Sequence, residues 1–406
     1  MSRYRLFPTS AQEARLLNHC AHARFVWNMA CEQQSWWRPG RGSPPGYVAQ
    51  ARQLTEARAE SGWLAAGSVT VQQQALRDFA QAMKNFFAGT HRRPTWRKAG
   101  RHESFRQVGF KPAHLRTLSR RWAEVWVPKV GWVRLRLSRP IPPGVTSYRI
   151  KRDRASRWHV AFAHVPDAIP SPGNGEVVGI DRGVAVSAAL SSGRLLHVPG
   201  LTEGETRRLA LLRRRLSRAV RGSNRRARLK AQIARMMARV ADRRRDWIEQ
   251  TSTRLARDFD LIGVEDLNIK AMTRSAQGTL NKPGRHVRGK ARLNRGILAN
   301  GWGGLVRRLE DKAPGRIVKI NAAYTSQTCH TCGHRAPENR ESQAAFRCVA
   351  CGLRVNADLN AAHNIAHLAR LTAGSAAGRA VAAPGGPGLP EPANREPRQA
   401  RLTSVA

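Results

Sequence analysis

The feature that most restricts how this chain can fold is a set of four cysteines in two closely spaced pairs. The pairs are Cys329-His-Thr-Cys332 and Cys348-Val-Ala-Cys351, with fifteen residues between them. Two short turns that each carry two thiolates can close a tetrahedron around Zn²⁺, and a glycine follows each pair where such a turn needs a permissive backbone. We therefore predict a zinc ribbon over residues 323–355, folded around one structural Zn²⁺.

The alternative interpretation of these pairs is redox chemistry, which would need a thioredoxin-like strand and helix beside each pair. The two remaining cysteines, Cys20 and Cys31, are scattered in helical sequence, so the pattern favours metal binding in a reducing compartment over disulfides. A zinc site closed by four cysteines has no open coordination position. Any catalytic residues should therefore lie elsewhere in the chain.

The charge of the chain indicates its partner. Lys and Arg number 71 and Asp and Glu number 27, which gives a formal net charge of +44. A polyanion relieves self-repulsion of this size, so nucleic acid is the expected partner. Apolar runs such as 261–264 are too short to span a bilayer, and the N-terminus lacks the apolar stretch of a secretory signal. We expect no membrane partner and a cytoplasmic protein.

The length of 406 residues predicts several modules. Helical spacing of apolar residues over 12–37 and 71–87 gives way to the alternation of antiparallel strands over 105–165, and residues 1–8 form a first short strand. After a Pro/Gly linker at 171–175, we predict strands at 177–180, 184–190, 261–264 and 316–320. Helices follow at 293–312 and 357–371, the second of them capped by Asn356. Residues beyond 372 lack large apolar side chains, which is typical of a disordered tail.

Three acidic residues stand where catalysis could use them. Asp181 and Glu265 directly end the predicted strands 177–180 and 261–264, and Asp358 lies in the first turn of the last helix. Each alone has a structural explanation, because acids cap turns and favour helix N-termini. Together, in so basic a chain, they predict a site for Mg²⁺ or Mn²⁺ beside a phosphate. Asp266 would point to the other face of its strand and ranks second.

A basic helical hairpin is predicted over 203–257. Between positions 207 and 245 there are 16 Lys or Arg and one acid, with apolar residues at helical spacing and a turn at 222–224. Single arginines on a helix usually form only a solvated face, but this density predicts that the hairpin lines a nucleic-acid channel. The residues that we expect to contact nucleic acid are Arg213, Arg214, Arg218, Arg225, Arg228 and Lys230.

Two further groups of side chains are candidates for contacts with bases. Hydrogen-bonding side chains on the helix at 71–87 could read a short DNA motif. These are Gln73, Gln74 and Arg77. Four tryptophans could stack on bases, although aromatic residues at helical spacing more often belong to a core. These are Trp27, Trp36, Trp37 and Trp96.

Four motifs occur in the order of the RuvC signatures of a known family. They are Gly179-Ile-Asp-Arg-Gly183, Val264-Glu-Asp-Leu-Asn-Ile269, Tyr324-Thr-Ser-Gln-Thr-Cys329 and Asn356-Ala-Asp-Leu-Asn-Ala-Ala-His-Asn-Ile365. By these motifs the chain resembles the TnpB family of RNA-guided nucleases from bacterial transposons, the ancestors of the miniature type V CRISPR effectors. Asp181, Glu265 and Asp358 fall on the catalytic triad of that family. His363 stands where the family more often has an arginine.

The resemblance implies a multidomain fold of α/β and β parts. Its first part is a β-barrel wedge domain (1–8 and 105–170) with a helical recognition insert (9–104). Its second part is an RNase H-like RuvC domain (171–322, with the basic hairpin 203–257), which the zinc ribbon interrupts and a last RuvC helix (356–371) completes before the tail (372–406). The resemblance also implies a guide RNA, double-stranded target DNA and metal-dependent DNA cleavage in a prokaryotic cytoplasm.

Three alternatives share much of this pattern. A miniature type V CRISPR effector would carry the same residues and differ in its genomic neighbourhood. A strand-transferring transposase would direct a DNA 3′ end, instead of water, at the phosphate. A non-enzymatic RNA-guided DNA-binding protein would rely on the zinc ribbon and the hairpin alone, and metal dependence separates it from a nuclease.

Overall fold

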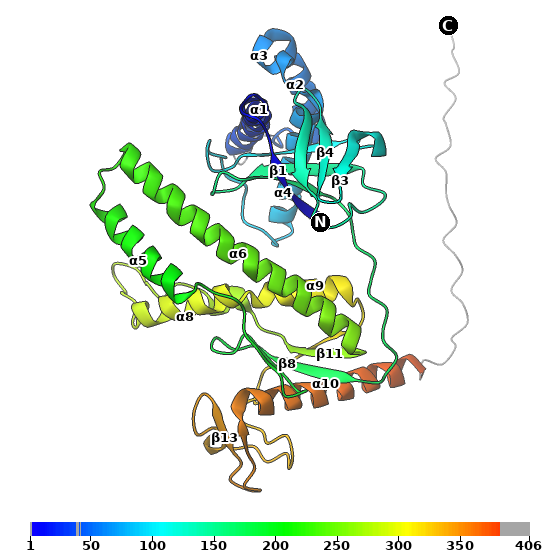
Figure 1. Cartoon of the computed structure of the whole chain (residues 1–406), viewed down its shortest axis with the longest axis vertical. Coiled ribbons are helices and arrows are strands. Elements are labelled where there is room, and N and C mark those ends of the chain that lie inside the picture. Colours follow the sequence, from blue (N-terminus) through cyan, green and yellow to red (C-terminus); the bar gives the residue numbers. More distant parts are fainter. Residues whose placement is uncertain (1, 38–39, 41, 382–406) are drawn as a thin grey trace. The chain divides into compact units, whose positions relative to one another are not determined.

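The computed structural model describes residues 2–37, 40 and 42–381, with side chains described as far as 374 (Figure 1). The chain divides into two compact units. The first comprises Met1–Ser171, His197–Arg257 and Lys270–Gly315, and the second comprises Pro172–Leu196, Asp258–Ile269 and the chain from Arg316 onward. Among the described residues, no helix combines the length and the apolar character that crossing a bilayer requires.

The first unit contains a seven-stranded antiparallel sheet with the order β2-β6-β7-β1-β5-β4-β3. Its strands are β1 (Ser2–Phe7), β2 (Ser104–Val108), β3 (Leu115–Ser119), β4 (Trp122–Val127), β5 (Gly131–Arg136), β6 (Ser147–Arg152) and β7 (Trp158–Phe162), with a short 3-10 helix η1 (Pro112–His114) before β3. The alternation in the sequence is the cause: Val125, Val133 and Leu135 are fully buried on one face while their neighbours face outward. The predicted antiparallel strands between 105 and 165 are confirmed.

Four helices accompany this sheet: α1 (Ser10–Ser35), α2 (Tyr47–Glu60), α3 (Gly62–Ala66) and α4 (Val69–Phe87). Helix α1 begins at a capping box, in which Thr9 accepts from the backbone N–H of Gln12 and the Gln12 side chain accepts from the N–H of Thr9. Apolar faces of α1 and α4 pack together, with Trp27 edge-on to Phe79 at 5.2 Å between ring centroids. The helices predicted at 12–37 and 71–87 are therefore confirmed.

The basic hairpin consists of α5 (Glu203–Arg218) and α6 (Asn224–Asp258), and α7 (Ile269–Met272), α8 (Val287–Asn300) and α9 (Trp302–Lys312) follow it. The prediction of one helix over 293–312 is wrong. The chain breaks at Gly301, whose φ of 70° is left-handed, and resumes as α9. This break lets α9 pack on α6, where Lys312 donates to the Glu249 carbonyl at 2.7 Å and to the Ser252 hydroxyl at 2.8 Å.

These helices pack with the antiparallel sheet, while the assignment of 171–322 to a RuvC-like domain that includes the hairpin stays a prediction. The contacts of α6 place the hairpin, α8 and α9 with the first unit. Arg157, in the turn between β6 and β7, donates to Asp242 of α6 at 2.6 Å, and Arg308 of α9 donates to Glu249 of α6 at 2.8 Å. Sequence patterns predict the helices but contain little information on ion pairs between residues that are far apart in the chain.

The second unit is built on a five-stranded sheet with the order β10-β9-β8-β11-β12. Its strands are β8 (Val177–Asp181), β9 (Ala188–Leu190), β10 (Leu195–Leu196), β11 (Leu261–Glu265) and β12 (Ile317–Ile320). Strand β9 is antiparallel to both of its neighbours, β8 and β10, and β11 runs parallel to both β8 and β12. Strand β9 begins later than the predicted 184–190, since residues 184–187 are bends.

The long helix α10 (Ala357–Val381) packs on this sheet, and a small module precedes it, made of η2 (Pro337–Asn339) and the antiparallel pair β13 (Ala345–Arg347) and β14 (Arg354–Asn356). Asn356 caps α10 as predicted, because its side-chain oxygen accepts from the backbone N–H of Asp358 at 2.9 Å. The helix continues past residue 371 to Val381, so residues 372–381 are helical and not part of a disordered tail. Residues 382–406 of the predicted tail lie outside the described residues.

Candidate active site and metal centre

The three predicted acids come together because of how the second unit folds. Strands β8 and β11 are parallel and in register, with Ile180 opposite Val264, so their carboxyl ends meet at one edge of the sheet. Asp181 ends β8 and Glu265 ends β11. Asp358, in the first turn of α10, reaches the same place from the helix that covers the sheet. All three acids line one cavity of about 370 Å³.

Two glycines bring α10 this close to the strands. A Cβ atom on Gly179 would lie 2.0 Å from the carbonyl oxygen of Ala362 and 2.4 Å from the backbone nitrogen of Ala366. A Cβ on Gly263 would lie 2.9 Å from the Ala369 methyl. The helix backbone therefore rests directly on the sheet backbone, a contact that only glycine permits. This contact fixes where Asp358 lies relative to the strand ends.

The carboxylates of the cavity repel one another and are partly shielded from water. Burial, followed by the charges of Glu265 and Asp358, raises the pKa of Asp181 to about 7. Burial also raises the pKa of Glu265 and of Asp358. The Thr325 hydroxyl donates to Glu265 at 3.0 Å and orients it. Three acids with raised pKa values and oxygen-only donors are the arrangement that a hard divalent cation would stabilise.

Two arginines in this cavity were not singled out from the sequence. Arg182 is 6% exposed and donates to the backbone carbonyl of Glu265, and its charge is also close to Asp181. Arg340 lines the cavity from the segment between the cysteine pairs, and it opposes the rise in the pKa of all three acids. The position of Arg182 beside Asp181 was a signal available in the sequence. No local sequence pattern identifies Arg340 as a site residue, because only the fold brings it to the ends of the strands.

Asp266 does not join this group. It is exposed, and its backbone N–H donates to the carbonyl of Ile320 at 2.8 Å, which continues the β11–β12 pairing for one residue. It does not line the cavity. The expectation that it points away from Glu265 agrees with this placement.

The four predicted cysteines form a second, separate cluster in which the four sulfur atoms all lie within 4.8 Å of one another. The Sγ atoms of Cys329 and Cys351 are 3.7 Å apart, and those of Cys332 and Cys348 are 3.6 Å apart. Zn–S bonds of about 2.3 Å place the sulfurs of a tetrahedral site about 3.8 Å apart. The donor set and its spacing therefore fit Zn²⁺.

The backbone around each pair has the turn that such a site needs. The N–H of Gly333 donates to the carbonyl of Cys329 and the N–H of Gly352 to that of Cys348, both at 2.9 Å. Both glycines have left-handed φ values, 75° and 73°. The two CxxC segments are thus matching knuckles, as their spacing predicted.

Comparison with known proteins identifies the family. Residues 2–42 match a family model described as "Helix-turn-helix domain", residues 159–276 one described as "Probable transposase", and residues 302–365 one described as "Cas12f1-like, TNB domain". InsQ of Escherichia coli (strain K12), which is named as a candidate RNA-guided DNA endonuclease, is 34% identical over 89% of this chain and 90% of its own length. The chain belongs to the TnpB family.

Two further relatives extend the comparison of this TnpB-family chain. A protein of Streptomyces pristinaespiralis, also named as a candidate RNA-guided DNA endonuclease, is 30% identical over 93% of this chain and 91% of its own length. Among solved structures, a Cas12f1–sgRNA–target DNA complex superposes with a TM-score of 0.52 at 14% identity, covering 88% of this chain and 82% of that one. This likeness shows a shared multidomain α/β fold.

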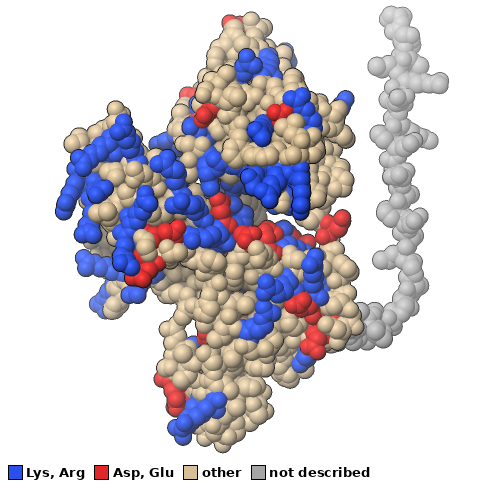
Figure 2. All heavy atoms as spheres, viewed as in Figure 1, with Lys and Arg blue, Asp and Glu red and all other residues tan. Residues whose placement is uncertain are grey.

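The basic hairpin of this TnpB-family chain exposes the six residues singled out for nucleic-acid contact: Arg213, Arg214, Arg218, Arg225, Arg228 and Lys230. Leu209, Leu212 and Met236 are buried between α5 and α6 and hold the hairpin together. Figure 2 shows the Lys and Arg side chains gathered over this hairpin. The charges are thus presented to solvent, where a polyanion can reach them.

The candidates for contacts with bases are divided between surface and core. Arg77 is exposed and Gln73 half-buried, and both bond the Tyr47 hydroxyl, at 3.0 and 3.2 Å. Gln74 is only 5% exposed, so it is unsuited to reading a base.

The four tryptophans divide in the same way. Trp27 belongs to the core and is covered by the Arg97 guanidinium, 3.5 Å from its ring centroid. Trp36, Trp37 and Trp96 are exposed, so part of each ring is accessible from the surface.

Proposed function

We propose that this protein is a transposon-associated, RNA-guided DNA endonuclease that cuts by a metal-dependent, RuvC-type mechanism at Asp181, Glu265 and Asp358. The observation that carries the proposal is the meeting of these acids in one cavity, at the ends of two parallel strands and under the first turn of α10. Two relatives that match nearly the whole chain bear the name of this activity. The topology of the five-stranded sheet also supports a nuclease of the RuvC type. An antiparallel trio followed by two strands parallel to the first is the arrangement of RNase H-like nucleases.

In this proposal the three acids hold Mg²⁺ or Mn²⁺, which when bound activates the attacking water and stabilises the leaving oxygen. The protein contributes position and charge. The Thr325 hydroxyl fixes the orientation of the Glu265 carboxylate, and the α10 backbone fixes Asp358. Arg340 lies in the same cavity and offers a guanidinium to the scissile phosphate, whose charge grows in the transition state.

The four cysteines hold a structural Zn²⁺ in this proposal. Their sulfur donors are complete without a further ligand, so the ion supplies folding energy to the module between β12 and α10. That module carries Arg340 and leads directly into Asp358. Zinc binding and the geometry of the acids are therefore coupled through the chain.

Guide RNA and double-stranded target DNA are the proposed partners. The similar Cas12f1 structure is a complex with an sgRNA and target DNA, and the exposed basic residues of α5 and α6 supply the charge that such a hybrid needs. We assign the seven-stranded sheet to the wedge domain, α1–α4 to the recognition insert, and Gln73 and Arg77 to reading a motif beside the target. The curated Cas12f1 match covers only 14% of this chain, at 50% identity, which favours the transposon role over a CRISPR effector.

The experiment is cleavage of a DNA target by the full-length protein bound to the RNA with which it copurifies. Asp181→Ala should abolish Mg²⁺-dependent cleavage and leave RNA binding unchanged. Asp266→Ala is the matched control, because it removes an acid one residue beyond Glu265 that does not line the cavity. Wild-type cleavage by Asp181→Ala would exclude this site.

The same experiment separates the alternatives. Binding without any metal-dependent cleavage by the wild-type protein would indicate a non-enzymatic binder. Joined strands instead of free ends would indicate a strand-transferring transposase. Sequencing the copurified RNA tests whether the protein is transposon-associated or a CRISPR effector, since repeat-derived RNA would indicate a CRISPR effector.

A further inference from the structure

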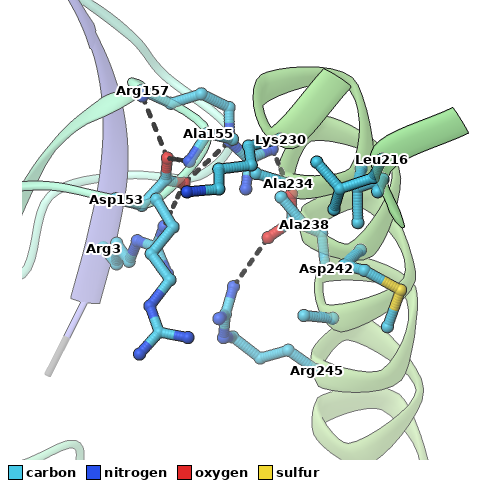
Figure 3. Close-up of a pocket in the computed structure, with 14 residues that line it drawn as sticks. Arg3, Asp153, Ala155, Arg157, Leu216, Lys230, Ala234, Ala238, Asp242 and Arg245 are labelled. Atoms are coloured by element: carbon cyan, nitrogen blue, oxygen red, sulfur yellow. Dashed lines mark hydrogen bonds and ion pairs between the residues drawn. The ribbon is translucent and has the colours of Figure 1, made fainter. Parts of the chain in front are cut away.

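A second cavity, of about 470 Å³, lies within the first unit and shares no residue with the acidic site. Three parts of the unit form it: Arg3 on β1, the turn 153–157 between β6 and β7, and the facing sides of α5 and α6 (Figure 3). Its volume is in the range of about 300–1,000 Å³ that small-molecule sites occupy. Its lining combines an apolar wall with a basic rim, which would complement the flat base and the charged phosphate of a nucleotide.

One wall of the cavity is apolar and comes from the helical hairpin. Its members are Leu216, Ile233, Ala234, Met237, Ala238 and Ala241. Leu216 and Ile233 are the edge of the hairpin core, but Met237 is 40% exposed. The small alanines on α6 leave room above the helix. The wall is therefore an open apolar surface onto which a flat ring can pack.

The rim of the cavity is strongly basic. Five cations line it, Arg3, Arg154, Arg157, Lys230 and Arg245, against two carboxylates, Asp153 and Asp242. The cavity thus has a surplus of three positive charges. An anion is the ligand that this balance favours.

The two carboxylates are already engaged. Arg157 bridges them, at 2.8 Å to Asp153 and 2.6 Å to Asp242, and Arg245 donates to Asp242 at 3.0 Å (Figure 3). Arg3 approaches Asp153 only to 3.9 Å. This ion-pair chain joins the β6–β7 turn to α6 and keeps the cavity open between them.

Two of the remaining cations lack such an ion pair among the described residues. Within the part of the chain that the structure describes, Lys230 and Arg154 form no ion pair. Burial, followed by the charge of Arg245, lowers the pKa of Arg3, and the charges of Asp242 and Asp153 only partly oppose this lowering. A phosphate between these side chains would relieve that repulsion. A purely structural role, in which the cavity only joins the β6–β7 turn to the hairpin, would explain the ion-pair chain. It would not explain the unpaired cations or the exposed Met237.

We propose that this cavity binds one unpaired nucleotide of an RNA strand, with the base on the apolar wall and its phosphate at Arg3, Arg154 and Lys230. The inference rests on the proposed function, in which the protein carries RNA. A duplex backbone fits less well, because it presents phosphates but no base face to the apolar wall. The ion-pair chain holds the wall and the rim at a fixed separation, so the site needs little ordering on binding.

The test is photocrosslinking of the full-length protein to a single-stranded oligouridylate that contains 4-thiouridine, followed by mass spectrometry. Crosslinks should fall on residues 233–241 of α6, and Met237→Gln should lower their yield about fivefold, which corresponds to the loss of about 1 kcal/mol of apolar contact with the base. Leu211→Gln is the matched control. Leu211 is 42% exposed on α5, close to the 40% of Met237, but lies outside the cavity.

A second pair of variants separates this site from general charge attraction. Arg154→Ala with Lys230→Ala removes two charges from the rim, and Arg213→Ala with Arg228→Ala removes two exposed charges of the hairpin outside it. The first pair should lose the α6 crosslink, and the second should keep it. Equal losses in both pairs, no crosslink within 233–241, or an unchanged crosslink in Met237→Gln would each overturn the proposal.

Two competitors identify the source of the nucleotide. Loss of the crosslink in millimolar adenosine 5′-monophosphate would assign the site to a nucleotide that can also bind free. Its survival would assign the site to a nucleotide held in a strand, and competition by duplex DNA alone would overturn the proposal. The crosslink needs no Mg²⁺ and no cleavage. Failure of the nuclease assignment, tested with Asp181→Ala, is therefore a distinguishable result.

Discussion

Substituting Gly179 tests whether the contact between α10 and β8 sets the geometry of the acids. A Cβ at this position would lie 2.0 Å from the Ala362 carbonyl oxygen. Real Cβ contacts of this kind are essentially never below 3.0 Å, so in Gly179→Ala the helix and strand must separate by about 1 Å. Backbone atoms form the obstacle, and no side-chain rotation can relieve it. Overpacking of this kind costs roughly 1–3 kcal/mol or more.

The separation moves a catalytic group. Asp358 lies one helical turn before Ala362 on α10, so a shift of the helix displaces its carboxylate relative to Asp181. A misplacement of about 1 Å can cost about 100-fold in rate. We expect Gly179→Ala to cleave about 100-fold more slowly than the wild type, while it keeps its zinc and binds RNA normally.

Two other glycines complete the series. A Cβ on Gly263 meets the Ala369 methyl at 2.9 Å and the backbone oxygen of Ile365 at 3.0 Å, so Gly263→Ala needs a smaller shift, of a few tenths of an ångström, and should slow cleavage less than Gly179→Ala. Gly289 in α8 has nothing within 4 Å, and Gly289→Ala should be neutral or slightly stabilising. The assays are single-turnover cleavage, zinc content and thermal denaturation. Equal rates for Gly179→Ala and Gly289→Ala would refute the reasoning.

Three further predictions concern the zinc site, the acids and the hairpin. Cys348→Ser should lose bound zinc, measured by atomic emission, and should also lose cleavage, because the module that carries Arg340 and precedes Asp358 loses its fold; full cleavage by the zinc-free variant would contradict this coupling. The folded-state pKa of Asp181 is raised to about 7, so its ionisation destabilises the fold increasingly as the pH rises from about 4 to 7 and fully above 7. In Mg²⁺-free buffer without chelator, the melting temperature of Asp181→Asn should exceed that of the wild type by a margin that grows between pH 5 and pH 8, and a constant margin would argue against the raised pKa. Affinity for single-stranded RNA should fall steeply with salt, and Arg213→Ala with Arg228→Ala should reduce the log–log slope by up to about 1.4; an unchanged slope would mean that these arginines do not contact phosphate.

The sequence by itself determined the features whose cause is local. The CxxC spacing and its glycines specify the two knuckles, since a tight turn needs only neighbouring residues. Asp181 and Glu265 were visible because a buried strand is a short apolar run and its last residue is fixed by the sequence. The hairpin and its exposed arginines followed from helical spacing in the same way.

The tertiary structure alone decided which distant segments meet. It brought Arg340 to the acids and Arg3 to α6, across separations that no local pattern spans. It also broke the helix at Gly301, where packing on α6 outweighs a helical sequence, and grouped the hairpin with the first unit. Such choices depend on the total burial and pairing of segments far apart in the chain, which periodicity and spacing do not encode.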